Sequence, residues 1–153
     1  MSGVDTIADV IAAMRAIEAT LPERDGVRWF NVLYRQVTEA IHVDAASWAD
    51  WCFLERFDVA FAKLYFEAIT IWEADPARIP RAWRPLFKAR HDETVAPVQF
   101  AVAGMNAHIN HDLVIALEHL ARSENNYASR ASARYEDFRR VNDVLERIEA
   151  ELR

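Results

Sequence analysis

Residues 48–72 read WADWCFLERFDVAFAKLYFEAITIW, and this stretch decides the fold class. Apolar side chains recur on every side of the helix that it predicts, among them Phe53, Phe61 and Ile69. A helix that is apolar all round is buried among other helices. We therefore predict a central helix surrounded by its neighbours. Asp58, a carboxyl group within this apolar stretch, needs a physical explanation.

Helices are also predicted on both sides of this stretch, from apolar residues spaced three and four apart. The first ends near Pro22, and the second follows the turn at Asp25 and Gly26 and ends near Ile41. Asp44 is predicted to cap the central helix that comes next, because an aspartate side chain accepts hydrogen bonds from the first backbone N–H groups of a helix.

The second half of the chain predicts two more long helices. One begins near Pro97 and ends at residues 123–126, and the last covers residues 135–152 with a single buried stripe. Residues 81–91, which lie before them, form a basic connector or a short helix. No stretch alternates apolar and polar residues long enough for a strand. The chain is therefore predicted to be all-α, a single compact bundle of about five main helices in one domain over residues 1–153.

The composition of the chain restricts the classes of partner and the cellular compartment that we expect. The chain has 24 acidic and 18 basic residues, a formal charge of -6, which disfavours nucleic acid as a partner. The longest charge-free stretch, residues 94–111, is marginal in length for a membrane span and contains two asparagines and two histidines, so no transmembrane segment is predicted. No secretory leader is recognisable. The only cysteine, Cys52, lies among apolar residues and is predicted to be buried as a small hydrophobe, which fits a reducing, cytoplasmic location. A homodimer is left open.

Residues 106–112, NAHINHD, hold the densest polar run of the chain. His108 and Asp112 are four apart on one helix face, so the carboxylate can accept the imidazole proton, fix the tautomer and raise the basicity of the ring. His111 lies just beside this stripe, and Asn106 and Asn110 flank it. The alternative is that these are hydrogen-bonded core or surface residues without a catalytic role.

Gly104 stands in the body of the same predicted helix, where glycine costs up to about 1 kcal/mol relative to alanine. We interpret it as a position that lets a neighbouring helix or a ligand approach closely.

Asp58 and Tyr65 are seven apart on one face of the central helix. Burial should raise the pKa of the Asp58 carboxyl group unless a partner compensates. The alternative is a structural ion pair with an arginine from another helix. Trp29 and Arg35, in a mixed aromatic and polar segment, are weaker candidates for lining a pocket.

Three strings carry a resemblance over most of the chain: GVRWFNVLY at 26–34, DVAFAKLYF at 58–66 and GMNAHINHDL at 104–113. Together they resemble a bacterial family of uncharacterised function that is common in actinomycetes. The third string is the most specific. The resemblance implies a helical domain, and it brings no established reaction, cofactor or catalytic residue.

The first functional hypothesis is a small-molecule acid–base enzyme without a cofactor, such as a dehydratase or cyclase for an apolar or aromatic, polyketide-like substrate. His108 is then the general base or acid, Asp112 orients it and Asp58 is the opposing acid. Tyr65, with Asn106 or Asn110, steadies developing oxygen charge. The residues expected to contact the substrate are Asn106, Asn110, His111, Trp29 and Arg35.

Two alternatives stay open. In a metal-dependent hydrolase or oxygenase, His108, His111, Asp112 and Asp58 would bind zinc or iron between facing helices. A di-iron site is disfavoured because neither histidine has a glutamate three residues before it. The third hypothesis is a helical module without catalytic activity that binds a ligand or a protein, with the polar run fixing the helix register.

Overall fold

The structure is a computed structural model that describes residues 3–124 and 132–151. Its helices are α1 (Ile7–Thr20), α2 (Gly26–Val43), α3 (Trp51–Ala74), α4 (Arg84–Ala89), α5 (Pro97–Ala107), α6 (Leu113–Glu124) and α7 (Ala133–Glu151). A π turn at His108–Asp112 joins α5 to α6 in one continuous helix, and short 3-10 turns lie at Ala45–Ser47 and Pro76–Arg78. No strand occurs in these ranges, so the predicted all-α fold is confirmed.

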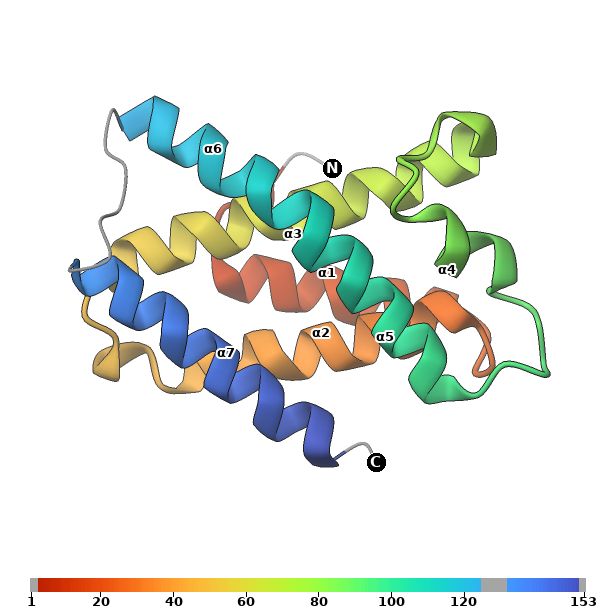
Figure 1. Ribbon diagram of the computed structural model, residues 1–153, viewed down its shortest axis with the longest axis horizontal. Helices are drawn as coiled ribbons and strands as arrows, with labels where there is room; N and C mark the ends of the chain where they lie inside the picture. Colours follow the sequence, from red (N-terminus) through yellow and green to blue (C-terminus); the bar gives the residue numbers. More distant parts are fainter. Residues whose placement is uncertain (1–2, 125–131, 152–153) are drawn as a thin grey trace.

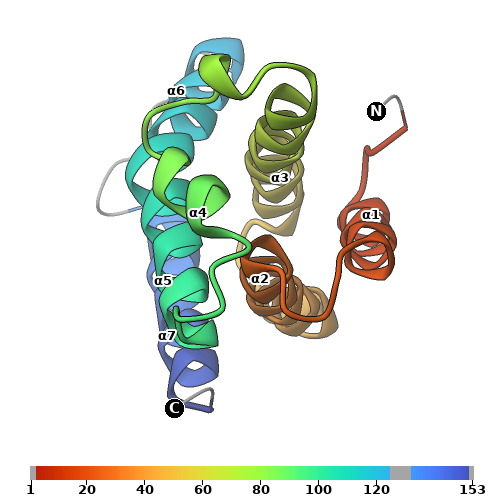
Figure 2. The same ribbon diagram turned by 90° about the vertical axis from the view of Figure 1, so that its right-hand side faces the viewer.

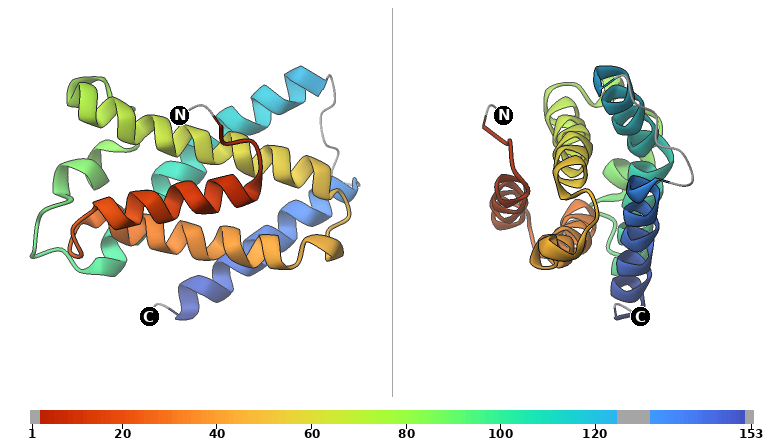
Figure 3. Two further views of the ribbon diagram at one scale, coloured as in Figure 1. Left: turned by 180° about the vertical axis from the view of Figure 1, so that it is seen from behind. Right: turned by 90° about the vertical axis from the view of Figure 1, so that its left-hand side faces the viewer.

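The described helices form three layers (Figures 1 and 2). Helices α2 and α3 lie in the middle, α1 covers one side, and α4 to α7 cover the other. From behind, α1 lies between α2 and α3 and contacts both (Figure 3). Helix α3 also contacts α6, α7 and the π turn, and α2 contacts α4, α5 and α7. The predicted central helix is confirmed, and α2 shares its position.

Aspartate caps set the beginnings of the two middle helices. Asp25 accepts a hydrogen bond from the N–H of Val27 (2.8 Å) at the start of α2, as the turn there predicted. The cap of α3 is Asp50, which accepts from the N–H of Phe53 (3.1 Å).

The prediction that Asp44 caps the central helix is therefore wrong, because Asp44 lies at the C-terminal end of α2. Trp48 is the physical reason. Its indole is buried and its Nε1 donates to the carbonyl of Ile41 (3.1 Å). This contact turns the chain back in a 3-10 turn before α3 can begin.

The prediction for Cys52 is also wrong, because its side chain is exposed. Successive residues of a helix point about 100° apart, so Phe53 and Leu54 are buried while Cys52 faces outward. An apolar sequence neighbourhood does not fix the direction of one side chain.

The remaining boundaries agree with the sequence where the structure describes them. Helix α6 ends at Glu124, within the predicted break, and α7 corresponds to the predicted last helix. Residues 125, 126 and 152 of those predictions lie outside the described ranges. None of the helices in the described part has the length and apolar character that crossing a membrane requires.

Candidate active site

The π turn brings His108, His111 and Asp112 together. His108 Nδ1 lies 2.9 Å from Asp112 Oδ2, and His111 Nδ1 lies 2.7 Å from Asp112 Oδ1. Adjacent residues of a regular α-helix do not face each other, so the wider turn explains how His111 and Asp112 pair. Single π turns within α-helices occur frequently at functional sites. The sequence predicted the contact between His108 and Asp112 but not the turn.

Asp112 is the centre of this cluster and is only 2% exposed. Besides the two histidines, it accepts from the indole Nε1 of Trp83, at 3.1 Å to Oδ2 and 3.3 Å to Oδ1. Each carboxylate oxygen of Asp112 therefore has two nitrogen atoms within hydrogen-bond distance. Sequence reasoning missed Trp83, because its segment carries no spacing that connects it with Asp112.

His108 presents one ring nitrogen to the interior. Its ring stacks on Phe61, with centroids 3.5 Å apart and planes 8° apart. Since Nδ1 donates to the Asp112 carboxylate, Nε2 of the neutral ring carries the lone pair. Burial lowers the pKa of His108, and the hydrogen bond to Asp112 partly offsets this. The neutral imidazole is thus a hydrogen-bond acceptor and a base near neutral pH.

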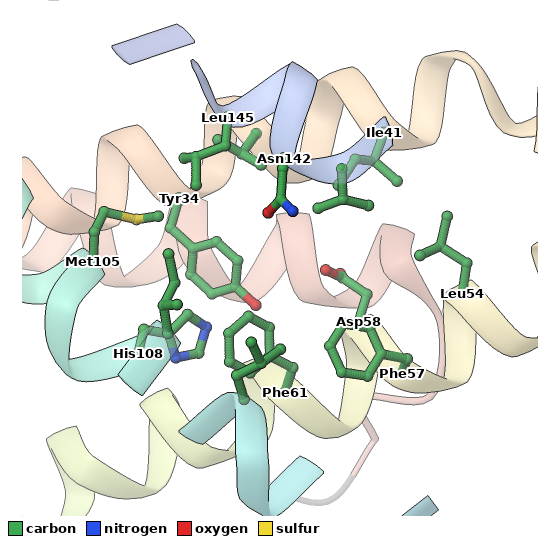
Figure 4. Close-up of a pocket in the computed structure, with 14 residues that line it drawn as sticks. Tyr34, Ile41, Leu54, Phe57, Asp58, Phe61, Met105, His108, Asn142 and Leu145 are labelled. Carbon is green, nitrogen blue, oxygen red and sulfur yellow. The ribbon is translucent and has the colours of Figure 1, made fainter. Parts of the chain in front are cut away.

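A cavity of about 70 Å³ lies between α2, α3, the π-turn helix and α7 (Figure 4). Its lining is mostly apolar, with Leu145 of α7 on one side. The polar side chains that line it are Tyr34, Asp58, His108 and Asn142. In Figure 4 the Tyr34 hydroxyl, the Asp58 carboxyl group and the His108 ring converge on the same space.

Those three residues also hold unpartnered buried atoms. Within the described part of the chain, four buried side-chain polar atoms have no hydrogen-bond partner, and Tyr34 Oη, Asp58 Oδ2 and His108 Nε2 are three of them. An unsatisfied buried polar group costs about 1–3 kcal/mol. Three of the four line one cavity.

Asp58 has the environment that the sequence predicted. It is 5% exposed, and burial raises the pKa of its carboxyl group to about 7. No arginine in the described ranges pairs with it, so the alternative of a structural ion pair is not what the structure shows. Burial therefore favours the protonated form of Asp58.

Tyr65 lies behind the cavity. Its hydroxyl donates to Asn31 Oδ1 (3.2 Å), and Asn31 Nδ2 donates to the carbonyl of Met14 (2.9 Å). This chain of bonds ties α3 to α2 and α1. Tyr34 occupies the position in the cavity that we expected Tyr65 to take. The only sequence signal for Tyr34 was its place in the mixed polar and aromatic segment that forms α2.

The structure does not bring the other predicted contact residues to the cavity. Asn106 and Asn110 are exposed, because they lie on the outward side of the π-turn helix. Trp29 is 38% exposed. Arg35 binds Glu18 and Glu39 at the surface between α1 and α2. His111 contacts Asp112 and is half-buried, outside the cavity lining.

Of the metal ligands proposed from the sequence, His108, His111 and Asp112 lie together in the π turn, and Asp58 of α3 lines the cavity with His108. In residues 3–124 and 132–151, no group of three or more histidine, cysteine, aspartate or glutamate side chains is placed to hold a metal ion. Asp112 turns both oxygens toward N–H donors, whereas Asp58 lies in the cavity with Tyr34.

Gly104 allows the close approach that the sequence suggested. A Cβ atom on Gly104 would overlap the ring of Phe30. Phe30 in turn contacts the rings of Tyr34, Trp83 and His108. The glycine therefore lets α2 and α5 pack closely enough to hold His108 among aromatic rings.

Comparison with known proteins identifies a family but no individual similar protein or structure. Searches of curated proteins and of solved structures gave no match. Residues 7–153 match a family of unknown function, DUF5995. This agrees with the resemblance noted from the three sequence strings. The chain belongs to the DUF5995 family.

Proposed function

We propose that this protein is an acid–base enzyme without a cofactor that acts on a small, largely apolar molecule, as a dehydratase or cyclase does. The observation that carries the proposal is the convergence of three unpartnered buried atoms, from Tyr34, Asp58 and His108, on one apolar cavity. Most buried side-chain polar atoms in proteins are hydrogen-bonded, so three without a partner in one cavity support a binding role.

Each residue has a distinct role in this proposal. His108 is the general base, since it lines the cavity, its buried Nε2 has no hydrogen-bond partner and burial lowers its pKa. Asp112 holds the tautomer and stabilises the imidazolium that forms when His108 takes a proton. Asp58 and Tyr34 provide the opposing acidic groups, so Tyr34 replaces Tyr65 in the scheme drawn from the sequence.

The size of the cavity limits the substrate. A cavity of about 150 Å³ holds benzene, and this cavity is about 70 Å³. The reacting end of the substrate therefore has only a few heavy atoms. A larger, polyketide-like molecule would have to extend past α7, whose Val141, Asn142 and Leu145 line one side. Among the described residues no lysine or arginine lines the cavity, which favours an uncharged substrate.

Proton abstraction can be measured even though the natural substrate is not identified. Small ketones and β-hydroxy ketones are incubated with the protein in D2O, and exchange of the C–H groups beside the carbonyl is followed by NMR. The wild type should accelerate exchange, and His108→Gln should lower the rate by about 10²–10⁴-fold, the usual contribution of a general base.

The matched control is His119→Gln on α6, because His119 is an exposed histidine on the same continuous helix. It should exchange like the wild type. Equal rates for the wild type and a folded His108→Gln variant would rule out His108 as the base.

A further inference from the structure

We propose that Tyr34 and protonated Asp58 donate two hydrogen bonds to one oxygen atom of a small uncharged carbonyl compound, so that the reaction passes through an enolate. This rests on the proposed acid–base function, and it names the substrate class and assigns Asp58 a specific role. The geometry behind it is one cavity that Tyr34, Asp58 and His108 line with unpartnered atoms, in which the Tyr34 hydroxyl lies between the Asp58 carboxyl group and the His108 ring.

Tyr34 is a permanent donor. Burial is the largest cause that keeps the pKa of Tyr34 well above its ordinary value, so the hydroxyl keeps its proton. The hydroxyl also has no acceptor within the described part of the protein. Its O–H bond is therefore available to an oxygen in the cavity.

Asp58 differs from Tyr34 because it carries its donor proton only in the neutral form. The titratable groups that line the cavity with it are Tyr34 from α2 and His108 from the π turn, with Asp112 behind the histidine. Helix α7 contributes the uncharged Asn142. No lysine or arginine of the described ranges lines the cavity beside Asp58. A carbonyl oxygen that accepts a hydrogen bond from the protonated carboxyl group favours this neutral form further.

The same lining selects against anions. A carboxylate or phosphate in this cavity would meet no cation from the described residues and would lie beside Asp58, in a protein of net charge -6. Burying an unpaired charge is costly. A neutral carbonyl group, in contrast, offers two lone pairs to the two donors.

The chemical step is balanced within this set of groups. His108 Nε2 takes a proton from the carbon beside the carbonyl, and the C–H electron pair forms a C=C bond. The C=O π pair moves onto oxygen, where the negative charge is held by the O–H groups of Tyr34 and Asp58. The imidazolium then returns the proton to carbon. In a dehydration it instead protonates a β-hydroxyl group, which leaves as water while the enolate re-forms its C=O bond and a C=C bond forms between the α and β carbons.

A donor and a proton-transferring acid respond differently to asparagine. The side-chain amide of the Asp58→Asn variant would still donate a hydrogen bond, but it could not transfer a proton to the carbonyl oxygen. We compare C–H exchange of 2-butanone in D2O for the wild type, Asp58→Asn, Asp58→Ala and Tyr34→Phe. Asp143→Asn, at an exposed carboxyl group on α7, is the charge control.

If Asp58 is a donor, Asp58→Ala and Tyr34→Phe should each lose about a hundredfold in rate. Asp58→Asn should lose only about tenfold, and its rate should no longer fall as pH rises above about 7. Equal losses in Asp58→Asn and Asp58→Ala would overturn the donor role, even where His108 is established as the base.

Binding provides a test that does not depend on turnover. Methyl NMR shifts of the cavity residues are titrated with 2-butanone and with propionate, which have the same number of heavy atoms. The wild type should bind 2-butanone more tightly than propionate, and Tyr34→Phe should weaken 2-butanone binding about tenfold. Equal binding of the two probes, or no effect of Tyr34→Phe on 2-butanone binding, would overturn the carbonyl site. If the wild type binds 2-butanone but does not accelerate its C–H exchange, only the proposed catalysis is overturned.

Discussion

Replacing Asp58 by asparagine should make the free energy of unfolding less dependent on pH. Asp58 is 5% exposed and its pKa is raised from 3.8 to about 7 in the folded protein by burial. Each unit of pKa difference between the folded and unfolded states corresponds to about 1.4 kcal/mol. The ionised carboxyl group therefore destabilises the fold by about 4 kcal/mol relative to the protonated one.

The sign follows from which state holds the proton. Below about pH 4 Asp58 is protonated in both states, and its contribution is neutral. As pH rises from there to about 7, the unfolded chain releases the proton while the folded chain keeps it. Stability therefore falls across this window and reaches its full loss once the folded protein is ionised as well.

Urea unfolding at about pH 5, 7 and 9 measures this effect. From the lowest to the highest pH, the wild type should lose a few kcal/mol of stability relative to Asp58→Asn. Asp143→Asn should follow the wild type, since Asp143 is exposed. Parallel pH profiles for the wild type and Asp58→Asn would refute the burial of an unpaired carboxyl group.

Three other predictions concern the surroundings of the site. Asp112→Asn should lower the pKa of His108 further below its ordinary value, because it removes the partner that raises it; an NMR titration of the ring checks this, and an unchanged midpoint would contradict it. Gly104→Ala should destabilise the protein by about 1–3 kcal/mol through overlap with Phe30, and Phe30→Leu in the same chain should recover part of the loss in urea unfolding; additive losses would argue against the overlap. Cys52 should react with a thiol reagent in the native protein, as its exposure requires; reaction only after denaturation would show that it is buried.

The site was only partly predictable because two kinds of contact are involved. His108 and Asp112 lie four residues apart on one helix, so their pairing is local and follows from helix periodicity. Trp83 reaches the same cluster from a segment 29 residues before Asp112, and Tyr34 reaches it from α2. Contacts over such separations depend on how whole helices pack, and no local spacing records them.

The errors have the same origin. Tyr65 shares a helix face with Asp58, but the bond to Asn31 turns its hydroxyl away from the cavity. Asn106 and Asn110 accompany His108 in the sequence, yet they are exposed. A rotation of the helix relative to its neighbours decides which of several polar residues faces inward.

The sequence by itself determined the all-α class, the order of the helices, the unusual character of Asp58 and the pairing of His108 with Asp112. These depend on apolar periodicity and on contacts within one helix turn. The tertiary structure alone decided the π turn, the role of Trp83, the replacement of Tyr65 by Tyr34 and the cavity under α7. The physical reason is that burial and the loss of hydrogen-bond partners arise between helices, where close packing rather than local propensity selects the arrangement.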